Sequence, residues 1–138
     1  MSAHVFDQAI ALTSTGNGLY TGATSPAYAN MVGPFGGITA ATMLNAVMLH
    51  PSLLGEPLSL TVNYCAALAD GAFEVSAQPV RTNRSTQHWV VLVTQAGASG
   101  EAETVATATV VTAARRETWS VDDEPMPAVR RPDEVKPY

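Results

Sequence analysis

The sequence predicts an α+β domain in which a curved antiparallel sheet of about six strands surrounds one long central helix. A long segment with helical spacing is the first sign, because no Asp, Glu, Lys or Arg occurs between Asp7 and Glu56. Beyond it, apolar and polar residues alternate as they do in strands with two unlike faces. Glycine, asparagine and aspartate recur between the alternating segments, where short turns join antiparallel strands.

The central helix is predicted from residues 38–49. Nothing in this segment breaks a helix before Pro51, and apolar side chains occupy nearly its whole circumference, which is typical of a buried helix. Pro34 suits a helix entry, and Gly36 and Gly37 leave the first turn without side chains. A ligand can therefore approach the backbone closely at this point.

The segment before the helix predicts a short amphipathic opening followed by a hairpin. Residues 10–15 and 19–23 flank Gly16, Asn17 and Gly18, which accept the positive φ of a tight hairpin turn. Residues 25–30 then form a loop that leads into the helix.

Four strands are predicted after Pro51. The first lies near residues 58–65, where Leu58, Leu60, Val62 and Tyr64 alternate with polar residues, and the second at 72–81, after an Asp70-Gly71 turn. A polar turn at 81–85 precedes the third strand, 87–95, whose apolar middle predicts a central strand covered on both faces. Residues 104–112 are rich in Val, Thr and Ala and form the last strand.

The composition changes abruptly after residue 114. Eleven of the 19 charged residues and four of the nine prolines lie between Arg115 and Pro137, a density that cannot build a core. We therefore expect one domain at residues 1–114 and a tail or linker at 115–138.

Composition also excludes several functions. A net charge of −5 with seven basic residues argues against nucleic-acid binding. The interruptions at Gly33, Pro34 and Asn45 argue against a membrane span. Cys65 is the only cysteine, so no internal disulfide forms; with no leader pattern at the start, a cytoplasmic location is expected. Cys65 itself is predicted to be a small, mostly buried apolar residue. No zinc-binding spacing, phosphate loop or serine-hydrolase elbow is present, and no metal is expected.

Three segments together resemble a known family. They are residues 28–37, with the sequence YANMVGPFGG, the strand 57–64, with the sequence PLSLTVNY, and the turn 81–85, with the sequence RTNRS. Their order and spacing resemble the amino-terminal half of TesB-type acyl-CoA thioesterases, over roughly residues 5–115. The resemblance implies a hot-dog fold, in which a sheet wraps one helix.

The resemblance also implies a partner. Members of this family usually carry two hot-dog repeats that pair, with the acyl thioester bound between them, and the tail at 115–138 matches the position of their inter-repeat linker. Two arrangements remain open: a fragment or split half of a double hot-dog, or a homodimer with isologous contacts. In either case the expected ligand is acyl-CoA, with coenzyme A as part of the substrate and no separate cofactor.

Hydrolysis of a thioester requires donors to the oxygen that becomes negative and a group that activates water. The backbone N–H groups at Gly36 and Gly37 are candidates for the first role, because helix N-termini carry unpaired donors and a positive dipole end; close helix–sheet packing is the alternative reason for the glycines. The helix contains no Asp or Glu to activate water. By the resemblance, Leu58 and Val110 replace the Thr and Gln that the catalytic repeat uses.

Polar and aromatic residues complete the predicted site. We expect catalytic roles for Gly37, Asn63 and Gln87, and substrate binding by Asn30, Phe35, Gly36, Tyr64, Arg84 and His88. Arginine suits the phosphates of coenzyme A. Each polar member also has a plain structural alternative: a solvated or dimer face for Asn63, a strand edge for His88 and an ordinary turn for Arg84. The predicted function is an acyl-CoA thioesterase domain that binds or hydrolyses its substrate against a second hot-dog; the alternative is a non-catalytic half that supplies dimer surface and an acyl tunnel.

Overall fold

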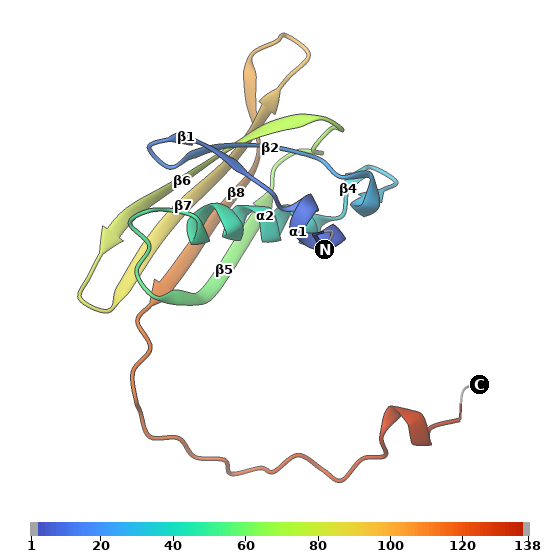
Figure 1. The fold of residues 1–138 in the computed structure, drawn as a ribbon, viewed down its shortest axis with the longest axis vertical. Coiled ribbons are helices and arrows are strands. Elements are labelled where there is room, and N and C mark those ends of the chain that lie inside the picture. Colours follow the sequence, from blue (N-terminus) through green and yellow to red (C-terminus); the bar gives the residue numbers. More distant parts are fainter. Residues whose placement is uncertain (1–2, 137–138) are drawn as a thin grey trace.

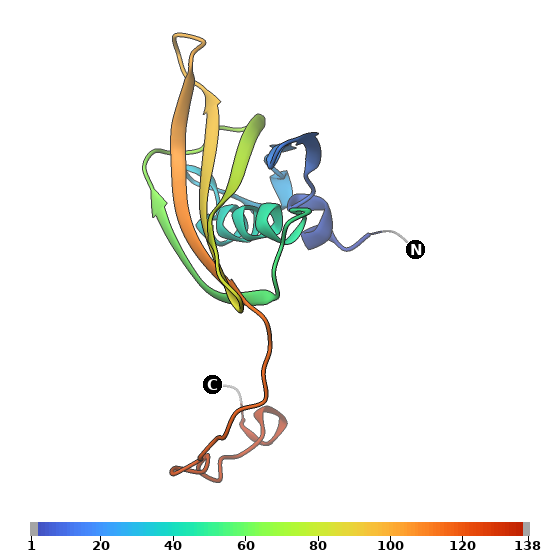
Figure 2. The same cartoon turned by 90° about the vertical axis from the view of Figure 1, so that its left-hand side faces the viewer.

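A computed structural model describes residues 3–136 of the chain. The predicted domain 1–114 and tail 115–138 each extend two residues beyond this range. Figure 1 shows one long helix against a curved sheet, and Figure 2 shows that the helix lies on the concave side of that sheet. None of the described helices is long and apolar enough to cross a membrane.

The six-stranded antiparallel sheet has the order β1-β2-β6-β7-β8-β5. Its strands are β1 (Thr13–Gly16), β2 (Leu19–Ala23), β5 (Glu56–Tyr64), β6 (Ala72–Thr82), β7 (Thr86–Ala96) and β8 (Ala102–Ala113). The predicted hairpin is present, with positive φ at Gly16, Asn17 and Gly18. Its first strand begins three residues later than predicted, because the N–H groups of Ile10 and Ala11 still donate to carbonyls of helix α1 (Val5–Ala9).

Helix α2 (Gly36–Met48) is the predicted central helix, and it begins at the two glycines. The segment before it is more structured than the predicted loop: a 3₁₀ turn, η1 (Pro26–Tyr28), leads into a small hairpin of β3 (Ala29–Asn30) and β4 (Gly33–Pro34). This hairpin is joined to the helix entry, because the Phe35 N–H donates to the Tyr28 carbonyl at 2.8 Å. Pro34 therefore ends a strand, and Phe35 is the N-cap residue.

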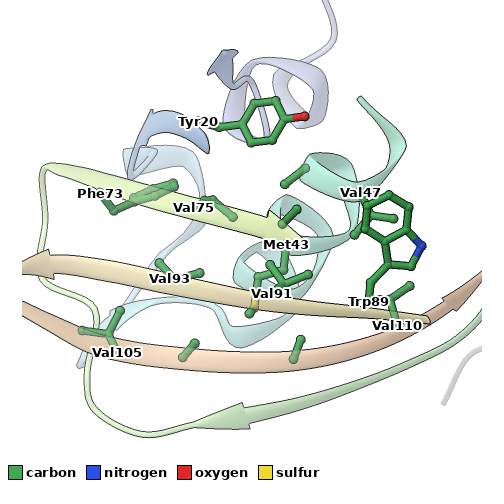
Figure 3. Close-up of a cluster of buried hydrophobic side chains, with 14 of the residues drawn as sticks. Tyr20, Met43, Val47, Phe73, Val75, Trp89, Val91, Val93, Val105 and Val110 are labelled. Atoms are coloured by element: carbon green, nitrogen blue, oxygen red, sulfur yellow. The ribbon is translucent and has the colours of Figure 1, made fainter. Parts of the chain in front are cut away.

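The core lies between α2 and the inner face of the sheet (Figure 3). Phe73, Val93 and Val105 lie at one end of the cluster, and Trp89, Val47 and Val110 at the other. Every side chain of α2 except that of Met48 is buried or half-buried, as expected for a central helix. Exposure begins at its carboxyl end, with Met48 and the C-cap residue Leu49.

Three other local predictions need correction. Strand β7 is central, but only its inner face is covered, because Val90 and Leu92 are 37% and 36% exposed on the outer face. Leu58 is exposed because a bulge between Pro57 and Ser59 disturbs the alternation of β5. Cys65 is exposed as well, since it follows the end of β5 and lies outside the sheet.

After β8 the chain runs away from the sheet (Figures 1 and 2). Residues 115–136 are exposed, and their only regular element is a 3₁₀ turn, η2 (Pro132–Glu134). Arg115 and Glu56 form an ion pair where this segment leaves the sheet. The large apolar side chains of the segment are all exposed to solvent: Trp119, Val121, Met126, Val129 and Val135.

Candidate functional site

The first turn of α2 opens onto a pocket of about 300 Å³. Its lining is uncharged: Val32, Pro34, Gly36, Thr39, Tyr64, Ala66, Ala67, Leu68, Val105 and Ala106. We call it the mouth pocket. It lies between the helix N-terminus, the end of β5 and the start of β8, so three segments far apart in the sequence form its walls.

The helix N-terminus supplies backbone donors beside this pocket. The first N–H groups of an α-helix have no intrahelical acceptor, and the side chain of Phe35 does not cap this end. With no acidic residue in the first turn, the positive end of the helix dipole is not offset there. A developing negative charge on a bound oxygen would be stabilised at Gly36 and Gly37.

Tyr64 holds the helix mouth in place. Its hydroxyl donates to the carbonyl of Gly36 at 2.6 Å. A Cβ on Gly36 would lie 3.1 Å from the tyrosine ring, whereas a Cβ on Gly37 would lie 2.4 Å from the ring of Phe35. Both glycines therefore permit close approach of an aromatic ring, which accounts for them structurally.

An exposed apolar rim borders the pocket. Met31 and Val32, at the tip of the β3–β4 hairpin, are 95% and 78% exposed, and Phe35 is 57% exposed. Large apolar side chains gathered beside a pocket are typical of a surface that another protein unit covers. The side chain of Asn30 only turns back to accept the N–H of Met31 at 2.8 Å.

The structure divides the predicted site residues among three places. Gly36 and Tyr64 line the mouth pocket, whereas Phe35 and Gly37 only adjoin Gly36 in the chain, and Asn30 lies in β3 of the hairpin before it. Gln87 lies beyond the other end of α2, with His88 next to it on β7 and Arg84 in the β6–β7 turn. Asn63 lies on the outer face of the sheet, where its amide approaches the hydroxyl of Thr107 at 3.5 Å. The predicted catalytic residues Gly37, Asn63 and Gln87 are thus not brought together in one chain.

Gln87 is buried, and its side-chain amide is hydrogen-bonded within the fold. It is 1% exposed, and its carbonyl oxygen accepts the N–H of Leu54 at 2.8 Å. Its amide donates to the Ser52 carbonyl at 3.0 Å and to the Thr82 hydroxyl at 2.8 Å. The side-chain carbonyl and one amide N–H of Gln87 therefore fasten the loop after α2 to the sheet, and the other amide N–H bonds Thr82 of β6. A catalytic role for Gln87 stays a prediction, as do the roles of Asn63, Arg84 and His88.

The pocket contains residues that the sequence did not single out, chiefly Thr39, Leu68 and Val105. The one sequence feature that could have indicated this part of the pocket is the run of small residues at 65–67, between β5 and β6, followed by the large side chain of Leu68. Among the described residues, no cluster of His, Cys, Asp and Glu is arranged to hold a metal ion. The pocket lining itself carries no carboxylate or imidazole.

Comparisons with solved structures place this architecture among hot-dog proteins. A hot-dog protein of unknown function from Alicyclobacillus acidocaldarius is 50% identical, with a TM-score of 0.87 over 98% of this chain and 49% of its own. Acyl-CoA thioesterase II TesB2 from Mycobacterium marinum has a TM-score of 0.73 at 18% identity, over 96% of this chain and 47% of its own. A tesB protein from Mycobacterium avium subspecies paratuberculosis gives 0.75 at 18% identity, over 93% and 48%. The chain spans about half the length of each.

No curated protein matches the sequence. The family model described as the acyl-CoA thioesterase N-terminal domain matches residues 25–113, a range that includes the whole of α2 and of β5 to β8. The chain therefore belongs to the family of acyl-CoA thioesterase N-terminal domains and has the hot-dog fold that its sequence predicted.

Proposed function

We propose that this chain binds the acyl end of an acyl-CoA in the mouth pocket and takes part in hydrolysis of the thioester together with a second hot-dog unit. The observation that carries the proposal is the pocket itself. An uncharged cavity of about 300 Å³ ends at the uncapped N-terminus of α2. The cavity suits an apolar acyl group, and the helix N-terminus suits the polarised carbonyl oxygen next to it.

The chemistry assigned to this chain is binding and polarisation. The thioester carbonyl oxygen accepts hydrogen bonds from N–H groups at Gly36 and Gly37, which stabilise the negative charge that develops on it. Water adds its oxygen to the carbonyl carbon and the carbon–sulfur bond breaks. The products are the free acid and coenzyme A, whose sulfur takes up a proton. Neither a metal nor a covalent intermediate is required.

The group that activates water is assigned to the second unit. The lining of the mouth pocket provides no general base, and base catalysis requires one within hydrogen-bond reach of the water. The exposed rim of Met31, Val32 and Phe35 beside the pocket supports a covering partner. So does the length of the solved relatives, which is about twice that of this chain. The partner is either a second copy or a carboxyl-terminal repeat.

The alternative function is a non-catalytic half that supplies the interface and the acyl tunnel while a different repeat performs hydrolysis. Two observations favour it: the pocket lining contains no general base, and the Gln87 amide is already occupied by hydrogen bonds within the fold. The two functions differ in whether copies of this chain alone catalyse the reaction.

The test uses the full chain with acyl-CoAs of increasing length. Release of free thiol measures hydrolysis, light scattering measures the molecular mass, and the shift in melting temperature measures binding. Hydrolysis by a dimer supports the enzyme, and binding without hydrolysis supports the non-catalytic half. Absence of both binding and hydrolysis would refute an acyl-CoA site in this chain.

A further inference from the structure

A second, much smaller void adjoins the mouth pocket and shares part of its lining. Its volume is about 10 Å³, close to the space that a single water molecule needs. It is lined mainly by apolar groups of α1, α2 and the sheet, including Ala9, Ile38, Phe73 and Val93. Phe73 and Val93 are visible in Figure 3 at the same end of the core as Val105, which lines the mouth pocket.

Three residues separate the two spaces, since Pro34, Thr39 and Leu68 line both. The proline ring is fixed and Thr39 belongs to the first turns of α2, so both are part of the scaffold. Leu68 is different. It is the one large apolar side chain in the connection between β5 and β6, and it is buried although its neighbours Ala67 and Ala69 are exposed.

The loop that carries Leu68 is fixed on both sides. Before it, the N–H groups of Cys65 and Ala66 both donate to the carbonyl of Val105, at 2.9 and 3.1 Å. After it, the side chain of Gln95 accepts the Ala69 N–H at 2.9 Å and donates to the Ala69 carbonyl at 3.0 Å. A loop held in this way gives the leucine side chain a defined position.

The backbone at Leu68 is also in close contact with the helix entry. A Cβ added to Gly33 would lie 2.4 Å from the Leu68 carbonyl oxygen, and Gly33 has a φ of +96°. The β3–β4 hairpin therefore packs directly on this loop. The wall between the pocket and the void is built from two segments that fix each other.

We propose that Leu68 is the residue that ends the acyl pocket and so sets the length of the acyl chain that this protein accepts. This inference rests on the proposed function and adds a specificity-determining residue to it. The pocket takes a linear acyl group from the helix N-terminus inward until its terminal methyl group meets Leu68. Chains that reach further are excluded because Leu68 closes the way to the void.

Shortening Leu68 joins the two spaces. Leu68→Ala deletes three carbon atoms and leaves a cavity that the surroundings fill only in part. An acyl chain about two carbons longer than the wild-type optimum then fits. Because burial of each methylene improves binding about fourfold, the preference for the longer chain over the original one is expected to rise by about fifteenfold.

The experiment compares wild type, Leu68→Ala and Leu53→Ala as full-length chains. Leu53 is the matched control, because it is partly buried against the core but lies beyond the other end of α2. Binding and thiol release are measured for straight-chain acyl-CoAs from butanoyl to palmitoyl. The expected result is a shift of the optimum to longer chains in Leu68→Ala, with the wild-type optimum kept in Leu53→Ala.

The outcomes separate the two proposals. If wild type binds acyl-CoA and Leu68→Ala keeps its chain-length profile, the role of Leu68 is refuted while the proposed function stands. An equal shift in Leu53→Ala would also refute it, by showing a general loosening. If wild type neither binds nor hydrolyses any acyl-CoA, both proposals fail. Leu68→Val deletes one carbon and replaces Leu68→Ala if that variant does not fold; its optimum is expected to move by about one carbon in the same direction.

Discussion

The two ends of α2 show opposite distributions of polar and apolar groups. At the carboxyl end, the amide of Gln87 is buried and bonded, and the indole N–H of Trp89 donates to Thr112 at 3.2 Å. At the amino end, backbone N–H groups are uncapped, and Met31 and Phe35 are exposed. The polar side chains at the carboxyl end are hydrogen-bonded within the chain, whereas the backbone donors at the amino end are left open beside a pocket.

The difference shows that a polar side chain in this sequence does not by itself indicate a functional residue. Buried polar side chains are costly unless they are hydrogen-bonded, so a fully bonded Gln87 is best explained by the stability it gives. At the amino end, the hydrogen-bond donors beside the pocket are backbone N–H groups of α2, and no charged side chain lines the pocket. A series of substitutions tests whether the carboxyl end of α2 mainly contributes stability and the amino end mainly contributes ligand binding.

The largest effect on stability is expected at the carboxyl end. Gln87→Ala leaves the Leu54 N–H, the Ser52 carbonyl and the Thr82 hydroxyl without their partner, which costs about 2–4 kcal/mol of unfolding free energy. Urea denaturation followed by circular dichroism measures the loss. The control is Gln78→Ala, which removes one exposed hydrogen bond to Asn17 and should cost less than about 1 kcal/mol. Equal losses in both variants would contradict the special role of the buried amide.

Tyr64→Phe is expected to have a smaller effect at the amino end. It removes the hydrogen bond from the Tyr64 hydroxyl to the Gly36 carbonyl, which contributes about 1 kcal/mol to stability. Acyl-CoA binding should weaken as well, because the helix mouth loses an anchor. Tyr28→Phe is the matched control, since among the described residues no hydrogen bond involves the Tyr28 hydroxyl. If both variants behave alike, Tyr64 does not position the mouth.

Gly37→Ala should separate the two properties. Alanine favours the helix over glycine by about 1 kcal/mol, and the exposed ring of Phe35 has space to turn away from the added methyl group. The free energy of unfolding is therefore expected to stay the same or rise by up to about 1 kcal/mol. Acyl-CoA turnover or binding should fall by about tenfold or more, because the methyl group hinders approach to the N–H donors. Unchanged binding would leave helix packing as the only role of the glycine.

The smallest effect is a pH dependence at the carboxyl end. Burial lowers the pKa of His50, whose Nδ1 accepts the Ser52 N–H at 3.1 Å and whose ring packs edge-on against Trp89. Because the unfolded chain binds the proton more readily, stability is complete above the unfolded pKa of about 6.5 and is lost as the pH falls through the lower folded pKa. Urea titrations between pH 7.5 and 5 measure this slope. His50→Gln should reduce it, whereas the same change at exposed His88 is the control; an unaltered slope in His50→Gln would contradict the assignment.

Most of the fold was predictable because it depends on local patterns. The uncharged helical segment, the alternation at 72–81 and the turn at Gly16, Asn17 and Gly18 each specify an element without reference to the rest of the chain. The errors occurred where neighbours decide the outcome. A bulge exposes Leu58, and Val90 lies on an outer face that none of residues 3–136 covers.

The site was predictable only in part. Gly36 and Gly37 could be predicted as a helix mouth because two adjacent glycines leave the first backbone N–H groups of a helix uncovered. Leu68 could not be predicted as a pocket wall, since its significance depends on a hydrogen-bonded loop and on a hairpin from a distant part of the chain. Gln87 and Asn63 were chosen as polar strand residues, and the register of the strands placed one inside the fold and the other on its outer face.

The sequence by itself determined the helix, its uncharged character and the glycines at its entry, because these follow from residue type and spacing along one segment. Only the tertiary structure decided which polar groups are already bonded, where the pocket ends and which apolar surface stays open. Those properties depend on contacts between segments that are distant in the chain, and the residue pattern of a single segment cannot predict such contacts.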